Sequence, residues 1–333
     1  MTNHTFSGDD LLTKHEQQTD HILGHDPQNR PIKELLENGL ILLDKPKGPT
    51  CNEIDTIIKN MLNLNKAGHS GTLDPNVSGV LPILLSNATK IAPALQKQDK
   101  EYVTILELHS DLDHKTIKDT IYSFIGDIEQ MPPVKSAVKR QLRSRNISNI
   151  EILEIKDRHV LFTTNVEAGT YIRTLCNDIG KKLKTKAHMH SLRRTRSGPF
   201  TEQNLSTLHD IKDAIELYKE KGDESELRKH IYPVEKGTQH LKKIIVKDSC
   251  IASLLHGAPL HIQGISKYSK KIKKKTLVAI LSQRGELIAI SESQLKTDDI
   301  RTRNKGIAVK TKRIIMSQDT YPINWKTTEE EKQ

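Results

Sequence analysis

The sequence predicts a mixed α/β protein that ends in a small β-barrel. The length of 333 residues corresponds to about two domains. Up to residue 230, helical segments and short apolar or β-branched runs follow one another without the regular alternation of a doubly wound sheet. From residue 241 onward, short β-rich runs separated by turns predominate, which is typical of a small barrel.

The N-terminal region predicts a tail, a short helix, a strand and a second helix. Residues 1–30 are polar and lack a helical or strand period, so we expect a flexible tail or strap. A helical stretch over 32–37 ends at an Asn-Gly pair, and the apolar run 40–43 is typical of a buried strand. A turn with two prolines and a glycine then places Lys45 at the strand end. Apolar residues at helical spacing predict a helix over 52–62.

The middle of the chain continues the mixed pattern. Segments 103–108 and 159–166 are rich in β-branched residues and are expected to be strands. Helices are expected over 114–124 and 171–184, and a polar helical connector over about 205–230. We find no internal repeat.

Short β-rich runs characterise the C-terminal part. These runs are 244–246, 277–281, 287–290 and 307–309. A basic loop, 267–275 (KYSKKIKKK), lies among them. Such a loop either keeps a surface soluble or contacts RNA, and its place in the most basic part of the chain favours RNA. The candidate contacts are Lys270, Lys271, Lys273 and Lys274.

The net charge of +10 is concentrated at one end of the chain. Residues 240–318 hold 17 basic and 5 acidic residues, a net charge of +12, whereas residues 1–239 sum to zero and residues 319–333 to −2. This asymmetry indicates a polyanionic partner and favours nucleic acid over a uniformly basic surface. We therefore expect a tail or strap (1–30), a first domain (31–239), a basic domain (240–318) and a polar tail.

Composition argues against several protein classes. Hydrophobic residues make up 35% of the chain and the mean hydropathy is −0.56, which argues against residence in a membrane. The three cysteines lie far apart without a CxxC pair, so neither a disulfide framework nor a zinc cage is expected. The N-terminus lacks the basic start and apolar run of a signal peptide. We expect a reducing, intracellular location in the cytoplasm.

Two runs of basic residues without acidic ones lie in the first domain. Seven cations fall between 181 and 198, and five between 135 and 145. Solvated protein faces often carry such runs. Because the rest of this domain is neutral, we expect phosphate contacts here. The candidate residues are Lys135, Lys139, Arg140, Lys182, Arg193 and Arg194.

The loop at 68–75 (GHSGTLDP) is the strongest local signal. Its two glycines allow a close approach of the backbone to a ligand. Asp74 precedes Pro75, which disfavours helical geometry and holds the carboxylate on a stiff turn. Composition alone leaves open that this is an Asp-Pro turn without a functional role.

This loop and other segments resemble the catalytic motifs of TruB-type pseudouridine synthases. The further matching motifs are 44–48 (DKPKG), 79–82 (GVLP), 87–90 (NATK), 100–102 (KEY), 136–140 (SAVKR), 169–175 (GTYIRTL) and 192–198 (LRRTRSG). The C-terminal segment looks like a PUA domain, with 256–258 (HGA) near its start and 305–308 (KGIA) near its end. The resemblance covers residues 26–318 and implies an α+β catalytic fold with a mixed, largely antiparallel sheet, followed by a PUA-like β-barrel that anchors RNA.

Within this superfamily the sequence is most similar to the guide-RNA branch, the dyskerin-like catalytic subunits of H/ACA ribonucleoproteins. The segments 30–32 (RPI) and 132–140 (PPVKSAVKR) support this branch. Ser86 departs from the usual glycine and Met131 from a common basic residue, which puts local turn geometry and an RNA contact in doubt. The resemblance implies no organic cofactor and no metal. It implies as partners a guide RNA, a Nop-type protein, a Gar-type protein and a kink-turn-binding protein similar to a ribosomal protein.

The resemblance also implies roles for individual residues. Asp74 is the expected catalytic residue, either attacking C1′ or C6 of the nucleotide as a nucleophile or removing a ribose proton as a base. Arg173 is the expected cation that pairs with Asp74 and stabilises its charge. Tyr102 matches a tyrosine that stacks on the target base and assists proton removal at C5; packing in the core is its alternative.

Four further residues are expected to support the active site. His69 matches a histidine that helps to displace the target nucleotide from its stack, with loop hydrogen bonding as the alternative. Lys45 supports the pocket or a phosphate, and Leu192 lines the apolar side of the pocket. Tyr171 either supports the site or packs in the core.

The sequence therefore predicts an RNA pseudouridine synthase that acts on uridine in rRNA or tRNA as part of an H/ACA particle. Two alternatives stay open: a stand-alone enzyme acting on the T-loop of tRNA, and a non-catalytic RNA-binding scaffold. His188 and His190 have the spacing of a metal-binding pair, but we find no third ligand at a suitable spacing and expect no metal.

Overall fold

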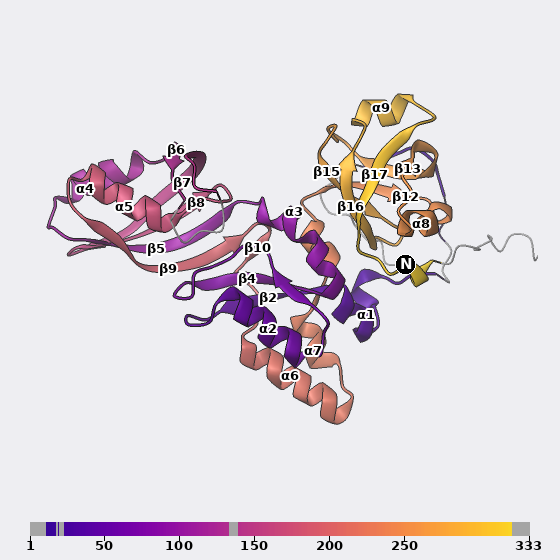
Figure 1. Cartoon of the computed structure of the whole chain (residues 1–333), viewed down its shortest axis with the longest axis horizontal. Helices are drawn as coiled ribbons and strands as arrows, with labels where there is room; N and C mark the ends of the chain where they lie inside the picture. The colour runs from indigo at the N-terminus through magenta and orange to yellow at the C-terminus, as the bar shows by residue number, and fades with distance from the viewer. Residues whose placement is uncertain (1–10, 18, 20–22, 133–138, 322–333) are drawn as a thin grey trace, which may run out of the picture.

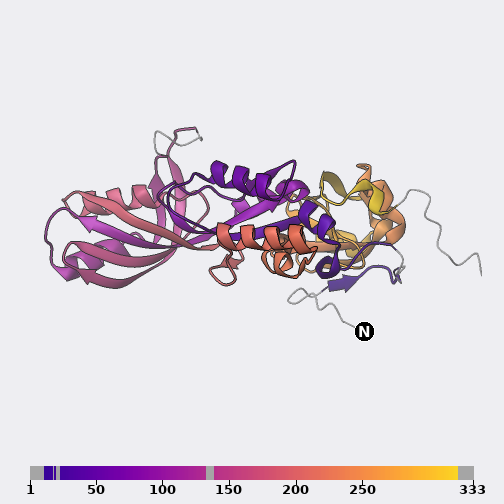
Figure 2. The same cartoon turned by 90° about the horizontal axis from the view of Figure 1, so that it is seen from below.

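The computed structural model of the chain describes residues 11–17, 19, 23–132 and 139–321. Within these residues the strands form two sheets, of ten and seven strands. The ten-stranded sheet fills the centre and left of Figure 1, and the seven-stranded sheet lies at the upper right. Seen from below, the molecule is elongated (Figure 2). None of the described helices has the length and apolar character needed to cross a membrane.

The ten-stranded sheet is mixed and largely antiparallel. Its strands are β2 (Gly39–Lys45), β3 (Ala67–His69), β4 (Ser78–Leu85), β5 (Lys100–Leu108), β6 (Gly126–Gln130), β7 (Arg143–Lys156), β8 (His159–Val166), β9 (Ala187–Ser197), β10 (Phe200–Thr201) and β11 (Tyr232–Pro233). The strand order is β11-β2-β4-β9-β5-β8-β7-β6, with β3 paired to β4 and β10 to β9. Only the β4–β9 pair is parallel among the pairs of this sheet in the described residues. The expected sheet type is thus confirmed.

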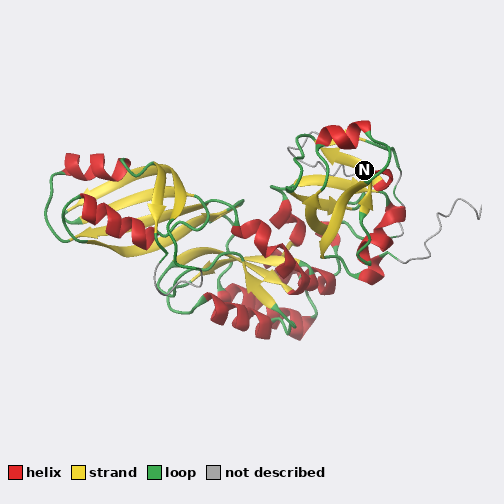
Figure 3. Ribbon diagram, turned by 45° about the horizontal axis from the view of Figure 1, so that its top comes forward, coloured by secondary structure: helices red, strands yellow, loops and turns green. Residues whose placement is uncertain are grey.

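Helices pack against the ten-stranded sheet (Figure 3). The helices of this part are α1 (Ile32–Glu37), α2 (Cys51–Met61), α3 (Ala92–Gln96), α4 (His114–Tyr122), α5 (Ile172–Lys182), α6 (Leu208–Lys221) and α7 (Ser225–His230). Capping boxes begin α2 and α6, where Thr50 and Thr207 exchange hydrogen bonds with the acidic residue three positions on. The helices expected over 114–124 and 171–184 are present as α4 and α5.

Alternating burial places the main core on one face of this sheet. Along β5 every second residue, from Lys100 to Leu108, is buried. The apolar members of this set, among them Leu106 and Leu108, join residues of α2, α4 and α5 in one hydrophobic cluster. The opposite side chains of β5, including Glu107, are half-buried. The sheet therefore has one sealed face and one face that reaches solvent.

The seven-stranded sheet contains the C-terminal part of the chain and one N-terminal strand. Its strands are β1 (Leu11–Thr13), β12 (Lys242–Val246), β13 (Leu260–His261), β14 (Ile265–Ser269), β15 (Leu277–Leu281), β16 (Leu287–Ser293) and β17 (Ile307–Ile314), in the order β1-β14-β12-β15-β16-β17-β13. Helices α8 (Asp248–Leu255) and α9 (Thr297–Thr302) pack against it. The described part of the expected tail or strap thus adds β1 to the edge of this sheet. Residues 267–269 of the expected basic loop belong to β14, and the exposed turn begins after them.

An apolar cluster joins the two sheets, and an ion pair lies at its border. The cluster combines side chains of β2 and β4 with side chains of β12, β15 and β16. At its border Arg30 donates two hydrogen bonds to Glu235, at 2.7 and 2.9 Å. Burial acts to lower the pKa of Arg30, but the carboxylates of Glu235, Glu286 and Glu34 together outweigh it and the net pKa is raised. Glu235 also accepts a hydrogen bond from the backbone of Leu287, so a single carboxylate connects the N-terminal segment to β16.

Candidate active site

Asp74 lies on an exposed turn between β3 and β4, in the Asp74 loop (residues 68–75). Its side chain is 59% exposed, while its neighbours Leu73 and Val77 are buried and anchor the turn in the core. The carbonyl of Asp74 accepts a hydrogen bond from Val77, and the carbonyl of Pro75 accepts one from Gly48. The turn therefore presents a carboxylate to solvent from a backbone that is fixed on both sides.

Lys45 supports this turn from the interior of the protein. The side chain is completely buried, and its ammonium group donates hydrogen bonds to the carbonyls of Pro46, Pro75 and Val77 at 2.9, 3.1 and 3.1 Å. Burial lowers the pKa of Lys45. Of the two predicted roles, the structure therefore places Lys45 in support of the pocket, since its charge is directed to backbone carbonyls away from solvent.

Arg194 supports the other end of the loop, which corrects the prediction that it contacts RNA. The side chain is only 1% exposed. Its guanidinium donates to the carbonyl of Val80 at 2.8 Å and to that of Gly71 at 3.0 Å. A phosphate has no access to a charge enclosed in this way. Gly79 allows β4 to approach the backbone of Arg194 closely, because it has a φ of +108° and a Cβ there would lie 2.2 Å from the carbonyl oxygen of Arg194.

Cys51, which the sequence analysis did not connect to the site, fixes the residue before Asp74. Its sulfur lies 3.1 Å from the backbone nitrogen of Leu73, which donates to it, and 3.4 Å from the Leu73 carbonyl. Burial raises the pKa of the thiol. This cysteine is the first residue of α2, so the helix start and the turn that carries Asp74 are held together. No short-range sequence signal reveals this contact.

The structure brings Asp74 and Arg173 together. A guanidinium nitrogen of Arg173 lies 2.9 Å from a carboxylate oxygen of Asp74, and both side chains are more than half exposed. Arg173 belongs to the first turn of α5. Before that turn, the buried side chain of Gln130 accepts a hydrogen bond from the backbone nitrogen of Tyr171 and donates one to its carbonyl. Gln130, which the sequence analysis missed, thereby fixes where α5 begins.

The remaining predicted site residues lie in the core or in the loop itself. Tyr102 and Leu192 are 9% and 7% exposed and belong to the main hydrophobic cluster, on the adjacent strands β5 and β9. His69 is held by Asp55, whose carboxylate lies 2.6 Å from Nδ1, and by the hydroxyl of Thr72, 3.1 Å from Nε2. Because an ionised carboxylate only accepts hydrogen bonds, Nδ1 of His69 is the nitrogen that donates to Asp55. The stacking and nucleotide-displacing roles stay predictions.

Comparisons with known proteins match nearly the whole chain. Residues 59–172 match the TruB family pseudouridylate synthase N-terminal domain, and residues 173–239 the tRNA pseudouridylate synthase B C-terminal domain. A "Probable tRNA pseudouridine synthase B" of Methanococcus maripaludis is 48% identical over 317 residues, which cover 95% of each chain. The chain belongs to the TruB family. It is an RNA pseudouridine synthase, an isomerase.

Other matches extend the family relationship to both ends of this TruB protein. Residues 242–315 match the PUA domain and residues 6–55 the DKCLD (NUC011) domain. A Cbf5 structure, titled as a Cbf5-Nop10-Gar1 complex, is 47% identical with a TM-score of 0.89 and covers 95% of this chain and 96% of its own. A structure of an H/ACA RNP bound to a substrate RNA containing 2'-deoxyuridine is 44% identical, also with a TM-score of 0.89, and covers 96% and 98%. The predicted family and fold are confirmed.

The other cations predicted to bind RNA differ in how accessible they are in this TruB protein. Arg193 is 37% exposed and its guanidinium is paired with Asp44 at 2.9 Å and Glu202 at 2.6 Å. Lys182 donates to the hydroxyl of Ser123 and lies over the ring of Phe124. The exposed cations of the predicted set are Lys139, Arg140, Lys182, Lys270, Lys271, Lys273 and Lys274. Lys135 lies outside the described residues.

We expect Arg173→Ala to slow pseudouridine formation by about 10²- to 10³-fold, the loss typical of one group that stabilises charge in an active site. Thermal stability should change little, because exposed ion pairs contribute about 0–1 kcal/mol. Release of tritium from C5-labelled uridine in single-turnover reactions measures the rate. Arg158→Ala is the matched control, since Arg158 forms an exposed ion pair with Asp111 in turns beside the same sheet. Equal rates in the two variants would contradict the assignment.

Proposed function

We propose that this chain is the catalytic subunit of an H/ACA ribonucleoprotein and isomerises uridines in rRNA or tRNA that a guide RNA selects. The observation that carries this proposal is the ion pair between Asp74 and Arg173, whose side-chain atoms lie 2.9 Å apart. The turn that bears Asp74 is supported by the buried side chains of Lys45 and Arg194. The similarity to Cbf5 structures solved with Nop10, Gar1 and RNA, over nearly the whole length of both chains, supports the guided mode.

The proposed chemistry requires one carboxylate and a cation. The N1–C1′ bond of uridine breaks, the uracil turns, C5 bonds to C1′, and the proton of C5 is lost while N1 gains one. Atoms and electrons balance without an external reactant. Asp74 either attacks C1′ or C6 or removes a ribose proton, and Arg173 stabilises the carboxylate in the charged form that both routes need. The exposure of Asp74 supports the proposal that bound RNA, with the target base turned out of its stack, completes the pocket.

We propose that the PUA domain holds the RNA away from this pocket. The net charge of +12 over residues 240–318 supports the role, as does the exposed turn after β14 that carries Lys270, Lys271, Lys273 and Lys274. Contacts of lysine with phosphate give affinity without base specificity. The guide supplies sequence selection by base pairing, so the protein itself needs little direct base readout.

As partners we propose a Nop-type and a Gar-type protein besides RNA. The related structures are a Cbf5-Nop10-Gar1 complex and a Nop10-Cbf5 complex. We also propose a cytoplasmic location, supported by free thiols at Cys51, Cys176 and Cys250.

A reconstitution assay tests the guided mode. The purified chain is incubated with a tRNA transcript or with an rRNA fragment, with and without a matching H/ACA guide RNA and the two partner proteins. We expect the rRNA fragment to be modified only when guide and partners are present. Efficient modification of the tRNA T-loop by the protein alone would favour the stand-alone mode. The archaeal relatives are named as probable tRNA pseudouridine synthases.

A further inference from the structure

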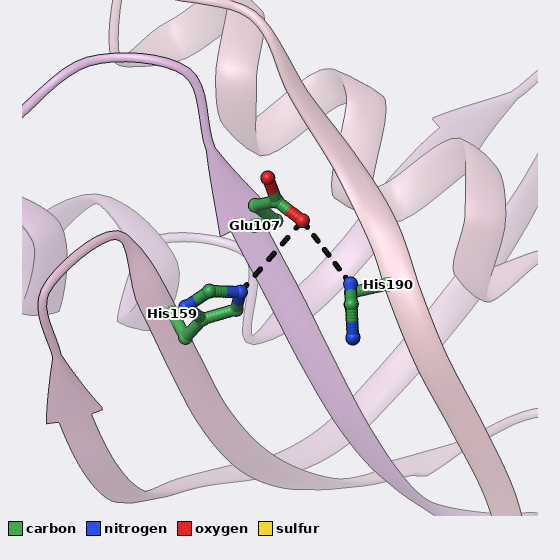
Figure 4. Close-up of side chains that lie close together, drawn as sticks. All are labelled: Glu107, His159 and His190. Carbon is green, nitrogen blue, oxygen red and sulfur yellow. Dashed lines mark hydrogen bonds and ion pairs between the residues drawn. The ribbon is translucent and has the colours of Figure 1, made fainter.

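A histidine-rich cluster lies on the solvent-facing side of the ten-stranded sheet, on its three neighbouring strands β8, β5 and β9. Glu107 of β5 is paired in register with His159 of β8 on one side and with His188 of β9 on the other. Figure 4 shows Glu107 with His159 and His190, whose side chains converge from the three strands. Cross-strand neighbours have Cβ atoms about 4.5–5.5 Å apart, so this register alone brings the side chains within reach.

A β-bulge in β9 adds His190 to the cluster. Ile105 pairs with Ser191, whereas the next residue, Leu106, pairs with Met189, so His190 is the extra residue on β9. Bulges re-aim the side chain of the inserted residue. Here Nδ1 of His190 lies 3.1 Å from a carboxylate oxygen of Glu107.

The distances around Glu107 match the edges of a metal coordination polyhedron. The same carboxylate oxygen lies 3.1 Å from His190 Nδ1, 3.4 Å from His188 Nε2 and 3.7 Å from His159 Nε2. In a tetrahedral site with bonds of about 2.0–2.1 Å, ligand atoms are roughly 3.3 Å apart. The ligand atoms of Glu107, His159 and His190 all lie within 4.8 Å of one another. An ion placed between these three atoms would therefore need only small side-chain rotations.

We propose that Glu107, His159 and His190 bind a divalent transition-metal ion of the zinc class. Two imidazoles and one carboxylate suit Zn²⁺ and its neighbours, whereas Mg²⁺ and Ca²⁺ take oxygen ligands. The three side chains are 33%, 47% and 51% exposed, so the ion enters from solvent and water completes its coordination.

His188 and His109 position Glu107 in this site. Nε2 of His188 contacts the carboxylate of Glu107 at 3.4 Å, and Nδ1 of His188 lies 3.0 Å from Nε2 of His109. The two rings meet edge to face, with centroids 5.2 Å apart. Such outer partners orient a ligating group, and their loss typically weakens metal binding by about 10–100-fold.

The metal site is separate from the active site. Glu107 lies five residues along β5 from Tyr102, which corresponds to about 17 Å at the rise of an extended strand. Neither Asp74 nor Arg173 contacts the cluster in the described structure. A bound ion would link three strands at the far end of the sheet, and its binding is measurable without any RNA.

Calorimetry with Zn²⁺ tests the proposal on the full-length chain, without an affinity tag that contains histidines and after chelator treatment and dialysis. We expect a wild-type isotherm with one strong site per chain. His190→Ala and Glu107→Gln should each weaken this site by more than about 100-fold, and His188→Ala by about ten-fold. With Co²⁺ as the probe, the visible absorption band of a tetrahedral or five-coordinate site should appear in the wild type and be lost in His190→Ala.

His256→Ala is the matched control, because His256 is an exposed histidine of the seven-stranded unit and is not part of the cluster. It should bind Zn²⁺ as the wild type does. All variants should retain wild-type rates of pseudouridine formation, which shows that they fold. A wild type without a strong Zn²⁺ site, or equal affinities in His190→Ala and His256→Ala, would overturn the proposal.

Discussion

Asp74→Asn is expected to abolish pseudouridine formation and to leave RNA binding nearly unchanged. The amide has almost the same size but cannot act as a nucleophile or as a base, and such losses reach about 10⁴-fold or more. Folding should persist, because the side chain is 59% exposed and its one ion pair, with Arg173, is on the surface. Tritium release from C5 measures the rate, and filter binding of a labelled substrate–guide duplex measures the affinity.

This variant also distinguishes an enzyme from a non-catalytic RNA scaffold. Asp111→Asn is the matched control, since Asp111 is an exposed acid that is paired with an arginine beside the same sheet. It should retain both activity and affinity. If Asp74→Asn isomerises uridine as fast as Asp111→Asn, Asp74 is not the catalytic residue. If the fully reconstituted wild type shows no isomerisation with any guide, the scaffold alternative is correct.

Arg194→Ala is expected to lower the free energy of unfolding by about 3–5 kcal/mol. The substitution removes two charged hydrogen bonds, each contributing about 1.5–3 kcal/mol, and leaves the carbonyls of Val80 and Gly71 without this donor. Activity should fall as well, because Gly71 belongs to the loop that carries Asp74. Urea unfolding followed by far-ultraviolet circular dichroism measures the loss, and Arg194→Lys, which retains the charge, should lose less.

The neighbouring Arg193→Ala provides the comparison. Arg193 is adjacent in sequence but partly exposed, and its partners are the carboxylates Asp44 and Glu202, so we expect a loss of about 1 kcal/mol or less. If both variants unfold at the same urea concentration and Arg194→Ala mainly weakens RNA binding, the buried supporting role is wrong and the original prediction of a phosphate contact is right.

The sequence predicted local elements well where one periodicity dominated. The strand expected over 159–166 coincides with β8, and the helix over 114–124 begins where α4 begins. The strand β9 was missed because its cations hid the alternation. Leu192 and Arg194 are buried, while Arg193 between them is half-buried, so a charged residue occupies a position that is apolar in ordinary patterns.

The candidate site, too, could be predicted only in part. The pairing of Asp74 with Arg173 followed from resemblance to a family, and the structure places the two groups together. The supports of the loop depend on contacts between distant segments, as for Cys51 with Leu73 and Gln130 with Tyr171, and no local pattern encodes them. The proposed metal ligands Glu107 and His159 likewise come close to His190 only through strand pairing.

The pairing of β1 with β14 has a consequence for how the protein is made. Leu11 aligns with Ser269, so the first described strand needs a partner that is translated 258 residues later. At about 5–20 residues per second, the ribosome produces that partner roughly 13–50 seconds after β1. The edge of the C-terminal sheet is therefore completed only after residue 269 has been synthesised, and until then β1 lacks this strand partner.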